Sequence, residues 1–331
     1  MIRPSARFAS AALLAFLSFP VLNAAAQQQT PQAQEPPVQD PAAPAPTGPP
    51  VFPKPDPADF NATLPTKDVV NAFMQANLGF DENSMWQVQA ISKTGIEGIT
   101  KVVVLIGDKT GKQQPYRFAF FTTPDGKHII IGEKIIPFGD HPFADFRAQL
   151  QQRADGPYRG SAAKDLELVE FADFQCPHCK AAQANMEKLV ADFPKAHIVF
   201  QNNPLPAVHP QSVTAAAYGY CVSKQSGSAA FFQFAAAVFD GQDGLNTPDG
   251  ATLTLNSAVT KAGLDPAKIA ACAATPEAKA AVDASIKLGA DMNIASVPAL
   301  MINGRQVPAT APYETLKQII QYQAKLDGVP Q

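Results

Sequence analysis

Hydrophobic and polar positions follow two different patterns along the chain from Thr66 onward. In the first region, Val69, Val70, Phe73 and Met74 share one face of a helix. Four strand-like runs follow, and turns rich in Gly, Asp, Lys and Thr separate the last three. The runs cover residues 86–91, 100–106, 116–122 and 128–136. The pattern predicts a small α+β domain over residues 66–140, in which the helix covers one face of an antiparallel sheet.

The second region mixes buried strands with long helical segments. A helix over 142–153, stopped by Asp155-Gly156-Pro157, is expected within a linker helix region at 141–157. The domain over 158–331 then reads strand–helix–strand, a helical insertion at about 211–290, and strand–turn–strand–helix. Outside the insertion, its expected elements are strands 166–171 and 197–202, helix 180–193, a strand ending at Asn303-Gly304, strand 306–308 and helix 313–325. Within the insertion, helices are expected over 213–222, 229–239, 255–262, 266–273 and 277–288.

The chain begins with two segments that are not expected to join either core. Residues 1–26 combine Arg3 and Arg7, a short apolar stretch and Ala24-Ala25-Ala26, which is typical of a cleaved secretory signal peptide. Residues 27–65 are rich in Pro, Ala and Gln and predict a disordered linker. The mature protein is therefore expected to be soluble, in a compartment where disulfides persist.

Composition narrows the class of protein further. A length of 331 residues with 46% hydrophobic and 17% charged residues fits about two packed domains. A formal net charge of −3 gives no support for nucleic-acid binding.

The strongest chemical signal is the Cys176-Pro177-His178-Cys179 motif, which lies between a predicted strand and a predicted helix. Residues i and i+3 share a face in the first helical turn, so the two sulfurs can meet. Free backbone N–H groups and the helix dipole stabilise a thiolate there. Pro177 suits the first helical position. If the ring of His178 approaches Cys176, it favours the thiolate as well.

This arrangement, with Val297-Pro298 before a later strand, resembles the thioredoxin fold with an inserted helical domain. The stretch Val169–Cys179 is similar to the active-site stretch of the DsbA family of bacterial disulfide oxidases. The resemblance covers Leu166 to about Lys325 and implies an α/β thioredoxin-like fold.

The resemblance also implies site roles. Cys176 would be the exposed nucleophile, Cys179 the resolving thiol, and Glu170 a buried acid that relays protons for Cys179. Pro298 would be a cis-proline facing the disulfide, and Val297 would offer its backbone to an extended substrate. The site would need no cofactor beyond the Cys176–Cys179 disulfide.

Cys221 and Cys272 lie on alanine-rich helical segments of the insertion. In a secreted protein, a structural disulfide between them is the preferred interpretation. Two separate buried thiols are the alternative. A zinc site is not expected, because a structural site needs four ligands and the other cysteines and histidines lack ligand spacing.

The first domain resembles, more faintly, the dimerisation domain of the DsbC and DsbG isomerases through residues 121–132. The sequence predicts a periplasmic oxidase that introduces disulfides into secreted substrate proteins and is reoxidised by a membrane redox partner. One alternative is a dimeric disulfide isomerase or reductase. Another is a non-catalytic peptide-binding or chaperone module.

Overall fold

The computed structural model describes residues 48–112, 114–132 and 134–330. All described elements fall within one compact unit, Pro46–Gln331. The predicted signal peptide, and residues 27–47 of the predicted linker, lie outside the described residues.

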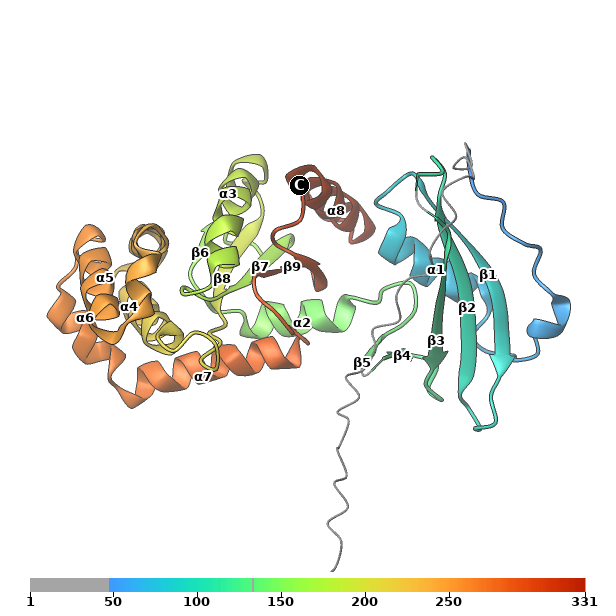
Figure 1. The fold of residues 1–331 in the computed structure, drawn as a ribbon, viewed down its shortest axis with the longest axis horizontal. Helices are drawn as coiled ribbons and strands as arrows, with labels where there is room; N and C mark the ends of the chain where they lie inside the picture. Colours follow the sequence, from blue (N-terminus) through green and yellow to red (C-terminus); the bar gives the residue numbers. More distant parts are fainter. Residues whose placement is uncertain (1–47, 113, 133, 331) are drawn as a thin grey trace, which may run out of the picture. The chain divides into compact units, whose positions relative to one another are not determined.

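The first sheet is an antiparallel meander in the order β1-β2-β3-β4-β5, covered on one face by α1 (Figure 1). Thr66 caps α1 by accepting a hydrogen bond from the Val69 N–H, which satisfies one of the free donors of the first turn. The apolar face of α1 packs on Val102, Val104 and Phe120 of the sheet. The elements of this region are η1 Pro57–Asp59, α1 Lys67–Leu78, β1 Ser84–Lys93, β2 Thr100–Asp108, β3 Tyr116–Thr122, β4 His128–Ile131 and β5 Lys134–Pro137.

The expected single strand over 128–136 is wrong. It is two short strands, β4 and β5, which pair with each other in antiparallel register. Gly132 takes a φ of 57°, a left-handed conformation that glycine adopts without steric cost, and the chain reverses there. The sequence did not indicate this turn, because residues 129–131 and 135–136 on either side of it are apolar and resemble one continuous strand.

The predicted disorder of the linker is also wrong at its C-terminal end. Residues 53–62 lie along β1, where the Ala62 N–H donates to the Ile91 carbonyl (3.1 Å). The Lys93 N–H donates to Asn61 Oδ1 (2.8 Å), and Phe60 packs against the core of this sheet. This segment therefore protects the outer edge of β1, which a proline-rich composition did not indicate.

The second sheet has the order β10-β9-β7-β8-β6, with β7 parallel to β8 and antiparallel to β9. The elements are α2 Ala144–Arg153, β6 Tyr158–Gly160, β7 Glu167–Ala172, α3 Pro177–Asp192, β8 His197–Asn202, α4 Ser212–Asp240, η2 Gln242–Asn246, α5 Pro248–Lys261, α6 Pro266–Ala273, α7 Pro276–Asp291, β9 Ala299–Ile302, β10 Arg305–Pro308 and α8 Tyr313–Leu326. β6 is an edge strand that the sequence did not indicate. The predicted order of strands, insertion and helices is confirmed.

Both faces of β7 are buried, and alternate side chains enter different cores. Leu168 packs with α3 and α8, whereas Val169 and Phe171 pack with α2 and the inserted helices α4–α7 (Figure 1). This explains why β7 reads as an almost continuous apolar run in the sequence. Phe174, just after β7, joins Phe200 and three phenylalanines of α4 in an aromatic cluster. The insertion is thus packed directly onto the loop that leads to the cysteines.

The predicted disulfide between Cys221 and Cys272 is confirmed, and it links α4 to α6 across 51 residues of sequence. Its Cα atoms are 6.0 Å apart, within the usual range for disulfides. α4 is broken at Gly227, where the φ of 77° interrupts the helix. The two predicted helices over 213–222 and 229–239 correspond to the two halves of α4.

We predict that the double substitution C221A/C272A lowers the free energy of unfolding by about 2–4 kcal/mol, because a cross-link of this span restricts the unfolded chain. Urea unfolding of both proteins without reductant, each carrying C176S and C179S so that no free thiol can exchange with the disulfide, measures the difference. Equal midpoints and equal slopes for the two proteins would contradict the prediction.

Candidate active site

Cys176 and Cys179 lie at the start of α3, immediately after β7. Cys176 is the N-cap residue, with extended backbone angles, and Pro177 occupies the first helical position as expected. Both cysteines are free thiols in this structure. Cys176 is only 5% exposed, so the expected exposure of this residue is wrong for this structure. Cys179 is fully buried, and Cys176 is the more accessible of the two thiols.

The surroundings of Cys176 favour its thiolate. Its pKa is lowered from 9.0 to about 6, first by a hydrogen bond from the Cys179 thiol, and then by the backbone N–H groups of Cys179 and His178. A protonated His209 lowers this pKa as well, whereas partial burial opposes the shift. A thiolate at the start of a helix is a good nucleophile and a good leaving group.

Cys179 responds in the opposite direction. Its pKa is raised by its hydrogen bond to Cys176, by burial, and by the charges of Cys176 and Glu170. The Asp173 N–H donates to the Cys179 sulfur (3.4 Å) and partly offsets this. The two thiols therefore differ in role, because the outer one ionises while the inner one keeps its proton.

Val297 lies against Cys176. The Val297–Pro298 peptide bond is cis, as the family resemblance implied, and the placement of Pro298 against the cysteines stays a prediction. The Cys176 thiol points at the Val297 carbonyl, with an Sγ–O distance of 3.8 Å. The Pro298 carbonyl accepts from the Ala309 N–H (3.3 Å), which fixes this segment to the chain after β10.

Glu170 lies in the middle of β7 and is 1% exposed. Burial raises its pKa to about 7, although a hydrogen bond from Gln183 Nε2 (2.8 Å) favours the charged form. The same Gln183 nitrogen donates to the Cys179 carbonyl (3.1 Å), so one amide bridges the acid and the inner cysteine. Glu170 therefore carries a proton over part of the neutral pH range.

The structure adds a group of residues that the sequence analysis did not place at the site. Asp173 accepts from the backbone N–H groups of Gln175 (2.7 Å) and Leu205 (2.9 Å), and its Oδ2 lies 2.8 Å from His209 Nδ1. Their pairing joins positions 36 residues apart, and no spacing rule indicates it.

Two glutamines fix the loop before α3 from the side of the insertion. Gln242 Nε2 donates to the carbonyls of Phe174 (2.8 Å) and Cys176 (3.0 Å). Gln175 donates to the Leu245 carbonyl (3.1 Å) and accepts from the Gln211 N–H (2.8 Å). Both side chains are buried, so their hydrogen bonds compensate for groups removed from water.

The side chain of His178 is exposed, and its contribution to the lowered pKa of Cys176 comes from its backbone N–H. A contact between its ring and the sulfur stays a prediction. Among the described residues, no group of three or more His, Cys, Asp or Glu side chains is placed to hold a metal ion. No helix in the same part of the chain has the length and apolar character to cross a membrane.

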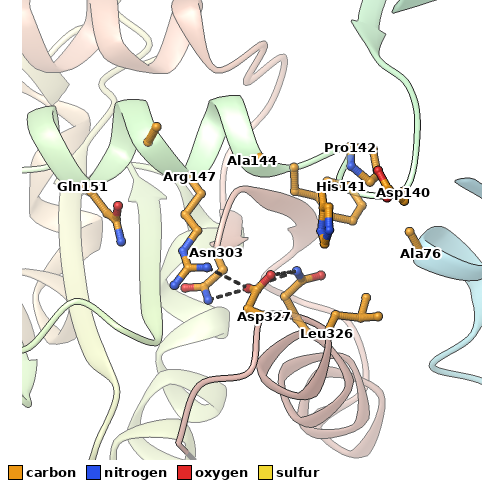
Figure 2. A pocket seen from close by; sticks show the side chains of 13 residues that line it. Ala76, Asp140, His141, Pro142, Ala144, Arg147, Gln151, Asn303, Leu326 and Asp327 are labelled. Atoms are coloured by element: carbon orange, nitrogen blue, oxygen red, sulfur yellow. Dashed lines mark hydrogen bonds and ion pairs between the residues drawn. The ribbon is translucent and has the colours of Figure 1, made fainter. Parts of the chain in front are cut away.

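A separate cavity of about 410 Å³ is lined by α1, α2, the Asn303 turn and the end of α8, and the cysteines do not line it. Figure 2 shows Arg147 and Asn303 directed toward Asp327. Asn303 Nδ2 donates to Asp327 (2.7 Å), and Arg147 lies 3.5 Å from the same carboxylate oxygen. Arg147 and Asp327 of this cavity are thus paired with each other.

The fold and the cysteine pair define a thiol:disulfide oxidoreductase. A family model described as thioredoxin matches residues 152–322, just over half of the chain, and the chain belongs to this thioredoxin family. This confirms the thioredoxin fold and the enzyme class expected from the sequence.

Solved structures with a similar fold cover the same region. A thioredoxin-like oxidoreductase from Silicibacter pomeroyi DSS-3 is 22% identical, covering 54% of this chain and 98% of that chain, with a TM-score of 0.46. The thiol-disulfide exchange protein alpha-DsbA2 from Wolbachia pipientis is 19% identical, covering 54% and 96%, with a TM-score of 0.46. ScsC from Proteus mirabilis is 21% identical, covering 56% and 77%, with a TM-score of 0.45.

A curated relative shares a shorter stretch. The Na(+)/H(+) antiporter NhaA 3 of Salinispora tropica is 31% identical over 91 residues, which is 28% of this chain and 14% of the antiporter. The chain therefore spans about one seventh of the length of that protein.

We predict that E170Q removes a pH-dependent loss of stability. Glu170 has a folded pKa of about 7 against an ordinary value of 4.5, so its protonated form stabilises the fold fully below pH 4.5. This stabilisation is lost as pH rises through 7, at a cost of about 3 kcal/mol. Urea unfolding of the reduced proteins should therefore show a smaller loss between these limits for E170Q than for wild type.

The matched control is E97Q, because Glu97 is an exposed acid that is not among the groups acting on the pKa of Glu170. Its unfolding free energy should follow the wild-type pH dependence. A wild-type pH dependence in E170Q as well would show that Glu170 is not the group responsible.

Proposed function

We propose that this protein is a periplasmic thiol:disulfide oxidase that introduces disulfides into secreted proteins. The observation that carries the proposal is the opposite effect of the site on its two thiols: Cys176 is favoured as a thiolate and Cys179 as a thiol. Stabilising the thiolate stabilises the reduced enzyme, and this makes the disulfide form a stronger oxidant. A pKa of about 6 for Cys176 favours the reduced form at neutral pH by about 1.4 kcal/mol, roughly a factor of ten.

The proposed reaction begins with the Cys176–Cys179 disulfide. A substrate thiolate attacks Cys176 Sγ, the bond to Cys179 breaks, and a mixed disulfide forms. The released Cys179 thiolate takes a proton, which Glu170 is placed to supply through its buried position beside α3. A second substrate thiolate then attacks the substrate sulfur of the mixed disulfide and releases the Cys176 thiolate. Two electrons pass from the substrate to the enzyme.

Binding of the substrate is assigned to the cis-proline segment. In the reduced enzyme the Val297 carbonyl faces the Cys176 sulfur, and an extended peptide attached to this sulfur would run beside the same backbone. Pro298 has no N–H and leaves no donor unsatisfied there. We assign Val297 and Pro298 to the substrate-binding surface, Cys176 and Cys179 to the exchange, and Pro177 and His178 to the start of the helix that stabilises the thiolate.

The periplasmic location is supported by the signal-peptide pattern of residues 1–26 and by the disulfide between Cys221 and Cys272. An oxidase is reduced by each turnover, so the proposal includes a membrane redox partner that restores the Cys176–Cys179 disulfide. Unfolded or folding secreted proteins are the proposed substrates.

We predict a reduction potential above about −200 mV for the Cys176–Cys179 pair, on the oxidising side of thioredoxin. Equilibration with glutathione buffers measures the potential, and acid trapping of thiols measures the redox state in the native compartment. The expected state is mostly oxidised. A mostly reduced pair would contradict the oxidase and support an isomerase or reductase.

Two cysteine variants complete this experiment. C176S and C179S should both abolish oxidation of substrates, because neither variant can form the Cys176–Cys179 disulfide. C179S should still accumulate mixed disulfides when its Cys176 attacks an oxidised substrate, because Cys179 is not there to release it. If C176S retains the full effect of the protein on its substrates, the non-catalytic chaperone module is the correct function.

The first sheet supports the alternative of a dimeric isomerase or reductase. β3 pairs with β2 along its whole length, but among the described residues it pairs with β4 only at Phe121 and Thr122. Its remaining edge, Tyr116–Phe120, offers backbone groups to a second copy of the chain. An unpaired strand edge is a common site of strand-to-strand association.

If this edge forms a dimer, A119K should weaken it, because Ala119 is an exposed residue of the open edge and lysine disfavours edge pairing. Light scattering across a concentration series is the measurement, with A119S as the matched neutral control. A wild-type protein that is monomeric at all concentrations would exclude the dimer.

A further inference from the structure

His209 and Asp173 form a polar pair directly beside the two active-site cysteines. His209 Nδ1 lies 2.8 Å from Asp173 Oδ2, and the side chains are 19% and 0% exposed. His209 is fixed through its backbone as well, because its N–H donates to the Leu205 carbonyl (2.9 Å) and its carbonyl accepts from Ser212 Oγ (2.7 Å). The imidazole ring therefore has a defined place next to the site.

Asp173 connects this ring to both cysteines through its own backbone. The Asp173 carbonyl accepts from the Cys176 N–H (3.1 Å), and the Asp173 N–H donates to Cys179 Sγ (3.4 Å). Its carboxylate accepts from the N–H groups of Gln175 and Leu205 in addition to contacting His209. One residue thus fixes the spacing between the cysteines and the histidine.

His209 contributes a positive charge to this cluster. This charge lowers the pKa of Cys176. The contact with Asp173 holds the ring beside the residue whose carbonyl accepts from the Cys176 N–H. The other titratable groups at the site are Cys179 and the exposed His178 on α3, and Glu170 on β7.

We propose that His209 stabilises the Cys176 thiolate electrostatically and that Asp173 is the positioning residue that holds its ring in place. His209, in the segment before α4, then contributes to the reactivity of Cys176. This contribution is in addition to that of the His178 backbone N–H at the helix start. This inference rests on the proposed thiol–disulfide exchange at Cys176. It assigns a second, distant segment of the chain to the tuning of the same reaction.

The test is a titration of the reduced full-length mature protein, followed by the ultraviolet absorbance of the thiolate. H209Q keeps a polar side chain but loses the positive charge, so the proton affinity of Cys176 should rise by about threefold to tenfold. The equilibrium with glutathione should shift by a similar factor toward the oxidised enzyme. The reason is that a less stable Cys176 thiolate destabilises the reduced form relative to the Cys176–Cys179 disulfide. H209R, which keeps a positive charge near Asp173, should retain the wild-type values.

Controls separate this role from a structural one. H178Q tests the exposed histidine at the helix start, and its effect should add to that of H209Q. Thermal unfolding with the Cys221–Cys272 disulfide intact shows whether each variant is folded. If H209Q is folded and its Cys176 titrates as in wild type, or if H209R behaves as H209Q does, the proposal is wrong.

The two proposals fail in different ways. A wild-type protein that does not exchange disulfides with glutathione would overturn the proposed function. A wild-type protein that exchanges normally, together with a folded H209Q of unchanged thiolate titration and unchanged equilibrium, would overturn only the role of His209.

Discussion

Asp173 is the residue on which the geometry of the active site depends most directly. Its backbone contacts both cysteines, and its carboxylate collects the N–H groups of Gln175 and Leu205 together with His209. A buried carboxylate is costly unless such donors compensate for the lost water, so the loop has one arrangement that satisfies it. Because β7 ends just before this loop and α3 begins just after it, the same arrangement sets the position of the helix start relative to the sheet.

The inserted helices are part of the site rather than an addition to it. Gln242 donates to two carbonyls of the loop, and Phe174 of the same loop is buried among the aromatic rings of α4. Removing the partner of a buried polar group lowers the free energy of unfolding by about 1–3 kcal/mol. The disulfide between α4 and α6 limits how far the helices that provide these contacts can separate. The rigidity of the cysteine loop therefore comes from both the sheet and the insertion.

Features set by local sequence were predictable, and features set by contacts between distant residues were not. The buried strand, the Cys-x-x-Cys helix start and the insertion helices follow from short-range periodicity, and all are present. The cis bond at Val297–Pro298 and the burial of Glu170 followed from family resemblance. The contacts of Gln183, Gln242 and His209 depend on which side chains the fold brings together. Polar residues in helices and loops follow no sequence periodicity from which such contacts could be predicted. The turn at Gly132 was missed because an apolar run surrounds it, and the ordered segment 53–62 because its prolines resemble those of the linker.

Arg305 shows that the first sheet and the thioredoxin-like region are energetically linked. It lies on β10, is 5% exposed, and donates to the carbonyls of Ala76 and Asn77 at the end of α1. Burial lowers its pKa to about 10, so it is still charged at neutral pH. The carbonyl end of a helix carries partial negative charge and suits such a cation, and the ring of Phe143 lies 4.5 Å from the guanidinium carbon. Arg305 lies on the β9–β10 hairpin that follows Pro298. Without α1, its guanidinium would lose the carbonyls of Ala76 and Asn77 as acceptors. The end of α1 therefore stabilises the strand pair β9–β10, which follows the cis Val297–Pro298 bond.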